Sequence, residues 1–463
     1  MRLHGSVRRA LSLWVVLFAA YAATLGIPSF AESPYAGGEP HVLLTAESIV
    51  VDRDLDVMNQ FRQRAYAAWY PYELEPRGRL TRGRAHDPDG MALALAVAPT
   101  YAVGGPLAVQ VLMAAVTALA FVLAAVLARR VVPEPWASLA TLGCALSPPV
   151  LAHATAVSPE LMAGALLAGA ALLALRARED PRLRWATPGT VLLAAAPWLS
   201  VRFAPAAAVI ALALVRWLLR RQRRFAAFFV GELLLFSAIF YATINQALYG
   251  GPTPHAAAAP GQGPLDATWP LGFLERSHRV VALWIDRDYG ALRWAPVIAL
   301  AFGGVWLLYR SRREHLAVVV RERIEVEVAA LLCALVCAAQ VLVAVFLTAT
   351  MFGFWFPGRN LLAALPLAVG LVAWGLRHAP KVGGALMALT LITSGWLVVE
   401  LYATGRGWVG PQSRAPLGPL EILVPDFAST TVGATIAIAA AVTGAILVVV
   451  REASRWRTAA PGR

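Results

Sequence analysis

The chain has 463 residues, of which 59% are hydrophobic and only 14% are charged, and its formal net charge is +13. Soluble domains contain about 25% charged residues, so this composition excludes an ordinary water-soluble protein. The positive charge does not indicate a nucleic-acid-binding protein, because the basic residues cluster between apolar segments, as in membrane proteins.

About twelve apolar segments repeat along the chain, and each is expected to form a membrane-spanning helix, which needs about 20 residues. The first follows Arg8 and Arg9 and is interpreted as a retained helix, with a cleaved signal peptide as the alternative. The predicted fold class is an all-α polytopic membrane bundle that forms one unit over residues 1–463. The expected spans are residues 11–30, 106–128, 136–152, 158–175, 187–200, 202–219, 225–246, 291–309, 327–349, 360–376, 382–402 and 431–450.

Basic residues gather at every second connection between these segments. Cytoplasmic loops carry an excess of arginine and lysine, so both termini are predicted to lie in the cytoplasm and the protein in the plasma (inner) membrane. The remaining connections then face outward. The basic clusters are Arg8/Arg9, Arg129/Arg130, Arg176 to Arg184, Arg220 to Arg224, Arg310 to Arg323, Arg377/Lys381 and Arg451 to Arg457.

Three of the outward connections are long. They cover residues 31–90, 247–290 and 403–430. Loops longer than about 15 residues are usually functional or disordered, and the aromatic and amphipathic stretches of the first two favour order. A short apolar segment, residues 91–103, extends the first loop to about residue 105. This segment and the stretch from Trp269 to Trp284 are expected to form helices at the membrane surface.

The segment between Arg184 and Arg216 has basic residues at both ends, so a hairpin with its tip outside is predicted. Each arm then has about 14–16 residues, or about 21–24 Å of helix. This is shorter than a hydrocarbon core of about 30 Å, so the tip around Arg202 is expected below the outer surface. A charge at that depth is a candidate functional residue, with snorkelling to the interface as the alternative.

The stretch Gly38-Glu39-Pro40-His41 begins a predicted helix just after the first span. Proline suits the first turn of a helix. Glu39, a carboxylate beside a histidine at the membrane rim, is a candidate general base. The alternative is a carboxylate that only complements the helix dipole.

Three arginines, Arg202, Arg293 and Arg359, are expected at one membrane depth near the outer surface. The planar guanidinium fork suits phosphate oxygens, so these residues are candidates for binding a lipid phosphate. Glu160 follows Ser158-Pro159 and is interpreted either as a helix cap or as part of the same site. The paired acids of the outer loops are weak metal-binding motifs, which allow a divalent metal but do not require one.

Several short motifs lie at the predicted outer surface. They are Gly38-Glu39-Pro40-His41 with Leu43-Leu44 and Asp54-Leu55-Asp56, His86-Asp87 with Gly90, Ser158-Pro159-Glu160, Pro197-Trp198 with Arg202-Phe203, Asp288-Tyr289-Gly290 with Ala295-Pro296, and Pro357-Gly358-Arg359-Asn360. Together they resemble the GT-C superfamily of membrane glycosyltransferases, in the branch that includes protein O-mannosyltransferases and the lipid A aminoarabinose transferase. The resemblance covers most of the chain.

The resemblance implies an inverting transferase that moves a hexose or pentose from a polyprenyl-phosphate donor, its co-substrate, to a glycan, lipid or protein acceptor on the extracytoplasmic face of the bilayer. It implies Glu39 as the base and Arg202 and Arg359, with Arg293, as the phosphate ligands. The candidates for the sugar, acceptor or metal site are His41, His86, Asp87, Glu160, Asp288 and Tyr289.

The chain departs from this family at Gly38, where the aspartate of an acidic pair is expected. If both acids are needed, the activity is weakened or lost. The alternative functions are a membrane transporter or flippase and a non-catalytic membrane scaffold. Many transporters are built from two related halves, and the chain shows no clear internal repeat.

Overall fold

The computed structural model describes residues 2–78, 84–258, 272–313, 321–348, 350–409, 425–427, 435–444 and 446–447. Over these ranges the fold is helical, with isolated β-bridges and no strand. The helices are α1 (Arg2–Ala22), α2 (Glu39–Val51), α3 (Met58–Gln63), α4 (Ala92–Ala128), α5 (Trp136–Ala145), α6 (Pro148–His153), α7 (Pro159–Glu179), α8 (Leu183–Leu199), α9 (Ala204–Arg220), α10 (Arg224–Tyr249), α11 (Gly272–Glu275), α12 (Arg279–Ile285), α13 (Ala291–Trp294), α14 (Leu300–Arg313), α15 (Arg321–Leu342), α16 (Leu365–His378) and α17 (Pro380–Thr404).

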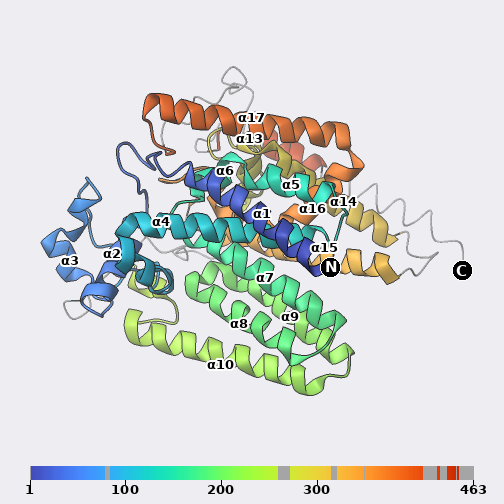
Figure 1. The fold of residues 1–463 in the computed structure, drawn as a ribbon, viewed down its shortest axis with the longest axis horizontal. Helices are drawn as coiled ribbons and strands as arrows, with labels where there is room; N and C mark the ends of the chain where they lie inside the picture. The colour runs from blue at the N-terminus through green and yellow to red at the C-terminus, as the bar shows by residue number, and fades with distance from the viewer. Residues whose placement is uncertain are drawn as a thin grey trace, which may run out of the picture.

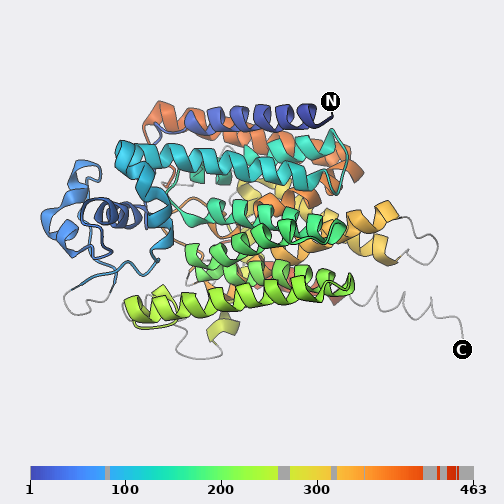
Figure 2. The ribbon, with the colours of Figure 1, turned by 60° about the horizontal axis from the view of Figure 1, so that its bottom comes forward.

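Short 3₁₀ and π-helical turns join some of these helices. They are η1 (Ala65–Ala68), η2 (Val201–Phe203), η3 (Pro254–Ala257), η4 (Arg276–His278), η5 (Pro296–Ala299), η6 (Val343–Leu347) and η7 (Arg359–Leu361). The long helices run side by side along one direction, and α2 and α3 lie beyond one end of the bundle (Figure 1). The turn between α7 and α8 and the turn between α9 and α10 lie at the opposite end, which is also the end at which α1 begins (Figure 2).

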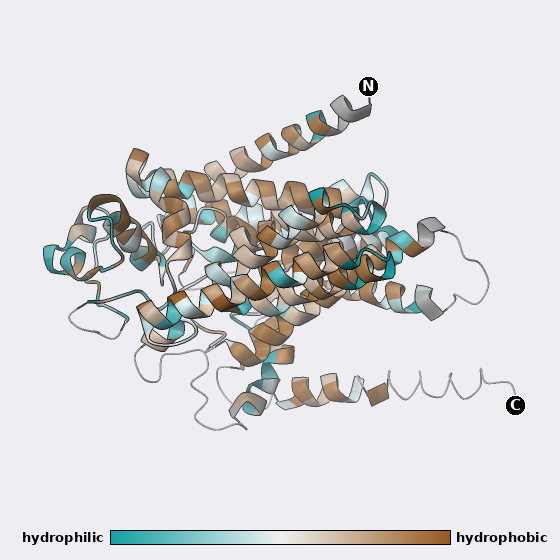
Figure 3. Ribbon diagram, turned by 90° about the horizontal axis from the view of Figure 1, so that it is seen from below, coloured by the Kyte–Doolittle hydropathy of each residue, from teal (hydrophilic) through white to brown (hydrophobic). Residues whose placement is uncertain are grey.

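Six helical stretches in the described residues are both long and apolar enough to cross a bilayer. Hydrophobic residues line the bundle along its length, and hydrophilic residues gather mainly at its two ends (Figure 3). This is the distribution that a bilayer requires of a membrane protein. The six stretches are Ala92–Ala128, Pro159–Glu179, Val201–Arg220, Arg224–Ala257, Ile324–Leu347 and Pro380–Thr404.

Two of the expected spans are interrupted in the structure, and a proline causes each break. The segment 136–152 forms α5 and α6 instead of one helix, because Ser147, which precedes Pro148, is extended (φ −71°, ψ 150°). The segment 291–309 is divided in the same way at Ala295, which precedes Pro296. Proline disfavours the helical conformation of the residue before it. Of the last expected span, 431–450, the structure describes residues 435–444 and 446–447, and Thr435–Gly444 forms a short apolar helix.

The predicted hairpin around Arg202 is present as α8 and α9, with η2 at its tip. Each helix has 17 residues, or about 26 Å at 1.5 Å per residue. The neighbouring helix α10 has 26 residues and extends further toward the end that carries α2 (Figure 1). The hairpin tip is therefore recessed relative to α10.

The first long connection folds into an ordered unit at the end of the bundle. Helix α2 packs on α4, and the apolar segment predicted at 91–103 is the first part of α4. The helix is kinked at Gly104 and Gly105, which have non-helical dihedral angles. In the second connection, α11, η4 and α12 fall within the predicted amphipathic stretch, whereas most of the third connection lies outside the described residues. A position of these helices at the membrane surface stays a prediction.

Helices α14 and α16 approach each other unusually closely. A Cβ atom added to Gly304 would collide with the backbone carbonyl of Leu371, and one added to Gly375 would collide with that of Leu300. Small residues at such contacts are typical of membrane helices, which associate through close packing instead of hydrophobic burial. This contact lies in the second half of α16, whose first residue, Leu365, follows shortly after the turn η7 that carries Arg359.

Candidate active site

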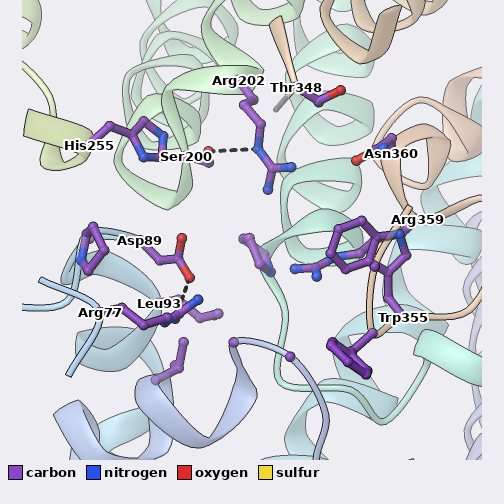
Figure 4. A pocket seen from close by; sticks show the side chains of 18 of the residues that line it. Arg77, Asp89, Leu93, Ser200, Arg202, His255, Thr348, Trp355, Arg359 and Asn360 are labelled. Atoms are coloured by element: carbon purple, nitrogen blue, oxygen red, sulfur yellow. Dashed lines mark hydrogen bonds and ion pairs between the residues drawn. The ribbon is translucent and has the colours of Figure 1, made fainter. Parts of the chain in front are cut away.

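A cavity of about 460 Å³ lies between α2, the tip of the α8–α9 hairpin and the segment before α16. Its wall contains three arginines and one carboxylate, together with apolar and aromatic side chains. Figure 4 shows the charged side chains pointing into this space. The lining residues are Gly37, Gly38, Val42, Arg77, Pro88, Asp89, Gly90, Leu93, Val157, Pro159, Leu199, Ser200, Arg202, His255, Ala258, Thr348, Thr350, Phe352, Gly353, Phe354, Trp355, Arg359 and Asn360.

Two of the three predicted phosphate ligands meet at one buried carboxylate. Arg202 Nη2 donates to Glu160 Oε1 at 3.2 Å, and Arg359 Nε donates to the same oxygen at 2.8 Å. The Glu160 side chain is 2% exposed, whereas the arginine side chains are 23% and 19% exposed. Glu160 is therefore buried behind the cavity wall and binds both arginines there, while both guanidinium groups remain accessible from the cavity.

Local backbone geometry puts each member of this triad in place. Ser158 is extended and precedes Pro159, so α7 begins there and Glu160 lies in its first turn. Arg202 lies in η2, where Ser200 Oγ accepts a hydrogen bond from its Nε at 3.2 Å. Gly358 adopts a positive φ of 89° just before Arg359, a conformation that glycine tolerates best. The Trp355 ring lies 5.1 Å from the Arg359 guanidinium carbon and covers one face of it.

A second charged cluster lies across the cavity. Arg77 Nη2 donates to Asp89 Oδ2 at 2.8 Å and to Asp87 Oδ1 at 3.3 Å. The Asp89 side chain is 49% exposed and that of Asp87 only 4%. Burial raises the pKa of Asp87. Burial also raises the pKa of Asp89, but Arg77, Arg202 and Arg359 outweigh it and hold that pKa below its usual range.

The predicted base, Glu39, lies behind the cavity wall. Its Oε2 accepts a hydrogen bond from the Val157 amide at 2.8 Å, and its Oε1 accepts one from the Ala36 amide at 3.3 Å. The side chain borders a separate space of about 20 Å³ that also contacts His153 and Arg359. Glu39 thus joins the start of α2 to the segment that precedes α7.

Burial raises the pKa of Glu39 to about 7, which makes its contribution to stability pH-dependent. The folded protein binds a proton that the unfolded chain, with a pKa near 4.5, has already released. This contribution is therefore fully present below about pH 4.5 and is lost as pH rises through about 7, a change of at most about 3 kcal/mol.

We expect the melting temperature of the wild-type protein to fall, relative to that of the Glu39→Gln variant, as pH is raised from about 4.5 to above 7. Thermal unfolding of the detergent-solubilised chain at a series of pH values measures the difference. The matched control is Glu73→Gln, which changes a loop side chain that is 76% exposed. Parallel curves for wild type and Glu39→Gln would contradict the prediction.

The two predicted histidines do not line the main cavity. His41 Nε2 donates to the Glu75 carbonyl oxygen at 2.9 Å, and burial together with Arg77 lowers the pKa of His41 to about 3. His86 Nδ1 lies 3.0 Å from the Leu55 carbonyl oxygen. Both histidines and Asp87 border a small internal space of about 10 Å³. The structure therefore places these three candidates beneath the loop surface, next to Arg77.

The remaining predicted residues form a separate group. Arg293 lies 3.7 Å from Asp288 Oδ1 and packs on Trp294, so it does not join Arg202 and Arg359 at the cavity wall. Tyr289 Oη donates to the Gly353 carbonyl oxygen at 2.6 Å, and Gly353 itself lines the cavity. Tyr289 thus supports the loop that carries Phe352 to Trp355, and neither Asp288 nor Tyr289 lines the cavity.

The described residues contain no group of three or more His, Cys, Asp or Glu side chains placed to hold a metal ion. In the motif Asp54-Leu55-Asp56, Asp54 accepts a hydrogen bond from Ser48, and Asp56 accepts one from the Ala85 amide. Asp87 and Asp89 are paired with Arg77. These donor sets do not fit a metal site.

Sequence reasoning did not single out Arg77, Asp89 or His255, which line the cavity. Asp89 stands in the run His86-Asp87-Pro88-Asp89, in which the paired acids by themselves indicate only a weak metal-binding motif. Arg77 lies in a stretch with four arginines between residues 77 and 84, and no local pattern predicts which of them lines a cavity. Only the folding of the first loop onto α4 and η3 brings these side chains together.

Neither a protein-family profile nor a curated protein matches this sequence. Among solved structures, ArnT from Cupriavidus metallidurans bound to undecaprenyl phosphate is similar with a TM-score of 0.46 and 14% identity, over 84% of this chain and 65% of that one. The oligosaccharyltransferase AglB from Archaeoglobus fulgidus, in complex with an inhibitory peptide and a dolichol-phosphate, is similar with a TM-score of 0.42 and 13% identity, over 89% of this chain and 58% of that one.

Both are membrane glycosyltransferases of the GT-C superfamily, which is the superfamily that the sequence motifs resemble. This chain spans less than two thirds of the length of either protein.

Proposed function

We propose that the protein is an integral membrane glycosyltransferase that moves a sugar from a polyprenyl-phosphate donor to an acceptor on the extracytoplasmic face. The observation that carries the proposal is the pair Arg202 and Arg359, which share Glu160 Oε1 and line one cavity. Within the described residues, the Nη groups of Arg359 and Nη1 of Arg202 donate no hydrogen bond to the protein. These groups are available to an anionic ligand.

A phosphate diester suits this pair better than a carboxylate or a neutral solute does. Two guanidinium forks from distant parts of the chain converge on one space and offer several donors for phosphate oxygens. The same donors would stabilise the negative charge that develops on the phosphate as the sugar leaves. Glu160 carries one negative charge against two positive ones, so a net positive charge remains at the site.

The depth of the site agrees with a lipid-linked donor. Arg202 lies at the tip of the recessed α8–α9 hairpin, whose neighbour α10 is longer and has an apolar outer surface. A phosphate attached to a polyprenyl chain lies at the boundary between the headgroups and the hydrocarbon core, and a recessed arginine can reach it from the protein side. We assign the cavity to the outer face, with both termini in the cytoplasm, from the arginine distribution.

We assign Glu39 a positioning role, because both of its oxygens accept hydrogen bonds from backbone amides. The transfer is proposed to invert the anomeric carbon, and the whole chain to act as one membrane-embedded unit. The acceptor, whether glycan, lipid or protein, would enter from the side of the first loop.

The test is binding of undecaprenyl phosphate to the full-length protein in nanodiscs, followed by native mass spectrometry. Arg202→Gln is expected to weaken binding about 10- to 100-fold, because a charge-assisted hydrogen bond to the phosphate is lost. The matched control is Arg184→Gln, at the other end of α8, whose side chain is 59% exposed. Equal binding by both variants would overturn the assignment of Arg202.

The reaction itself is tested with the same preparation and polyprenyl-phosphate sugars of several kinds. Release of free polyprenyl phosphate that depends on an acceptor supports a transferase. Movement of the intact lipid across the bilayer without sugar transfer would instead identify a flippase.

A further inference from the structure

Gly38 lies directly against the charged pair formed by Asp89 and Arg77. A Cβ atom built on Gly38 would lie 3.0 Å from Asp89 Oδ2 and 3.2 Å from Arg77 Nη2. The backbone of Gly38 is right-handed helical (φ −86°, ψ −8°), so its dihedral angles do not require glycine. The absence of a side chain at Gly38 leaves room for the carboxylate of Asp89 and the guanidinium group of Arg77.

Asp89 is the one acidic side chain among the described residues that line the main cavity. The other carboxylates nearby are engaged elsewhere. Glu160 is 2% exposed and holds two arginines, and Glu39 accepts hydrogen bonds from two backbone amides. The side chain of Asp87 is only 4% exposed.

The position of Asp89 relative to the cations suits a displacement reaction. Asp89 and Arg77 lie on one side of the opening, while the guanidinium groups of Arg202 and Arg359 extend into it from other sides (Figure 4). An inverting transfer needs the acceptor oxygen and the leaving phosphate on opposite faces of the anomeric carbon. A sugar placed between these groups would have the phosphate at the arginines and the acceptor hydroxyl at Asp89.

We propose that Asp89 is the general base of the transfer reaction and that Gly38 provides the space for it. This inference rests on the proposed function. One oxygen of Asp89 takes the proton of the acceptor hydroxyl as that oxygen forms a bond to the anomeric carbon. The bond from this carbon to the phosphate oxygen breaks, its electron pair stays on the phosphate, and polyprenyl phosphate leaves with Arg202 and Arg359 as ligands.

Because of these arginines, the basicity of Asp89 would depend on whether the donor is bound. Without a donor, Arg77, Arg202 and Arg359 hold the pKa of Asp89 low, and the carboxylate is a weak base. A phosphate bound to Arg202 and Arg359 opposes their charge, so Asp89 becomes more basic once the donor is bound. His41 and Asp87 also face Arg77, and His255 faces Asp89, so these groups contribute to the pH dependence.

The first test is Asp89→Asn in the full-length protein. Loss of a general base lowers the rate of chemistry about 10²- to 10⁴-fold, so we expect kcat to fall by at least about 100-fold. Binding of undecaprenyl phosphate is expected to be unchanged or tighter, because a negative charge is removed, and this binding also reports correct folding. The control is Glu73→Gln in the same loop, which is expected to keep full activity.

The second test moves the carboxylate to the neighbouring position. Asp89→Gly is expected to be as inactive as Asp89→Asn, and the double variant Gly38→Asp/Asp89→Gly is expected to regain at least about tenfold in kcat, with a shifted pH profile. Full activity of Asp89→Asn, or a folded, lipid-binding double variant with no recovery, would overturn the inference. If the wild-type protein transfers no sugar from a polyprenyl phosphate, the proposed function itself has failed, which is a separate result.

Discussion

Arg359→Ala is expected to lower the rate of sugar transfer by about 10²- to 10³-fold. Removal of one preorganised donor to a developing negative charge has an effect of this size. Arg359 contacts Glu160 only through Nε, so its two Nη groups are available to the phosphate, and the Trp355 ring holds its plane in place. Initial rates with a saturating polyprenyl-phosphate sugar measure the loss.

Two further variants separate charge from geometry at this position. Arg359→Lys keeps the positive charge but loses the planar fork, so it is expected to recover only part of the rate. Arg377→Ala, which removes an exposed arginine at the far end of α16, is the control and is expected to be fully active. Equal rates for Arg359→Ala and Arg377→Ala would remove Arg359 from the mechanism.

Glu160→Ala is expected to cause the largest loss of stability of the substitutions considered for this site. The change leaves Arg202 and Arg359 without the buried oxygen to which both donate. Breaking a buried ion pair by removing one partner destabilises a protein by about 3–5 kcal/mol. We expect a lower melting temperature and lower yield of folded protein in detergent.

The same helix supplies the control for this prediction. Glu179→Ala removes a carboxylate at the other end of α7, where Glu179 pairs with arginines but its side chain is 27% exposed. Exposed pairs contribute about 0–1 kcal/mol, so this variant is expected to melt near the wild-type temperature. A double variant, Glu160→Ala/Arg359→Ala, is expected to lose less stability than the sum of the two single changes, because it leaves one unpaired cation instead of two. Strict additivity would contradict the role given to Glu160.

Local chemistry was sufficient to predict a mostly helical membrane protein and the recessed hairpin, but not the number or the bounds of the helices. Hydrophobic run lengths indicated the spans, and the arginines flanking residues 184–216 indicated two short arms with Arg202 at the tip. The two errors in helix continuity, at Ser147 and Ala295, arose because an apolar run of spanning length was preferred over the local effect of Pro148 and Pro296. Prolines do occur inside other helices of the chain, such as Pro99 and Pro188. The presence of a proline alone therefore does not predict that a helix is interrupted.

By itself, the sequence determined that the chain is a helical membrane protein, that Arg202 and Arg359 lie near helix starts, and that Glu160 lies in a first helical turn. These are consequences of apolar length, charge and proline position, which act within a few residues. Only the tertiary structure decided that Glu160 joins the two arginines, that Arg293 pairs with Asp288 instead, and that Asp89 fills the space beside Gly38. The contacts of Glu160 with the two arginines and of Gly38 with Asp89 join residues more than 40 positions apart, which no local sequence pattern predicts. Arg293 and Asp288 are only five residues apart, but the conformation of the turn between them decides that they pair.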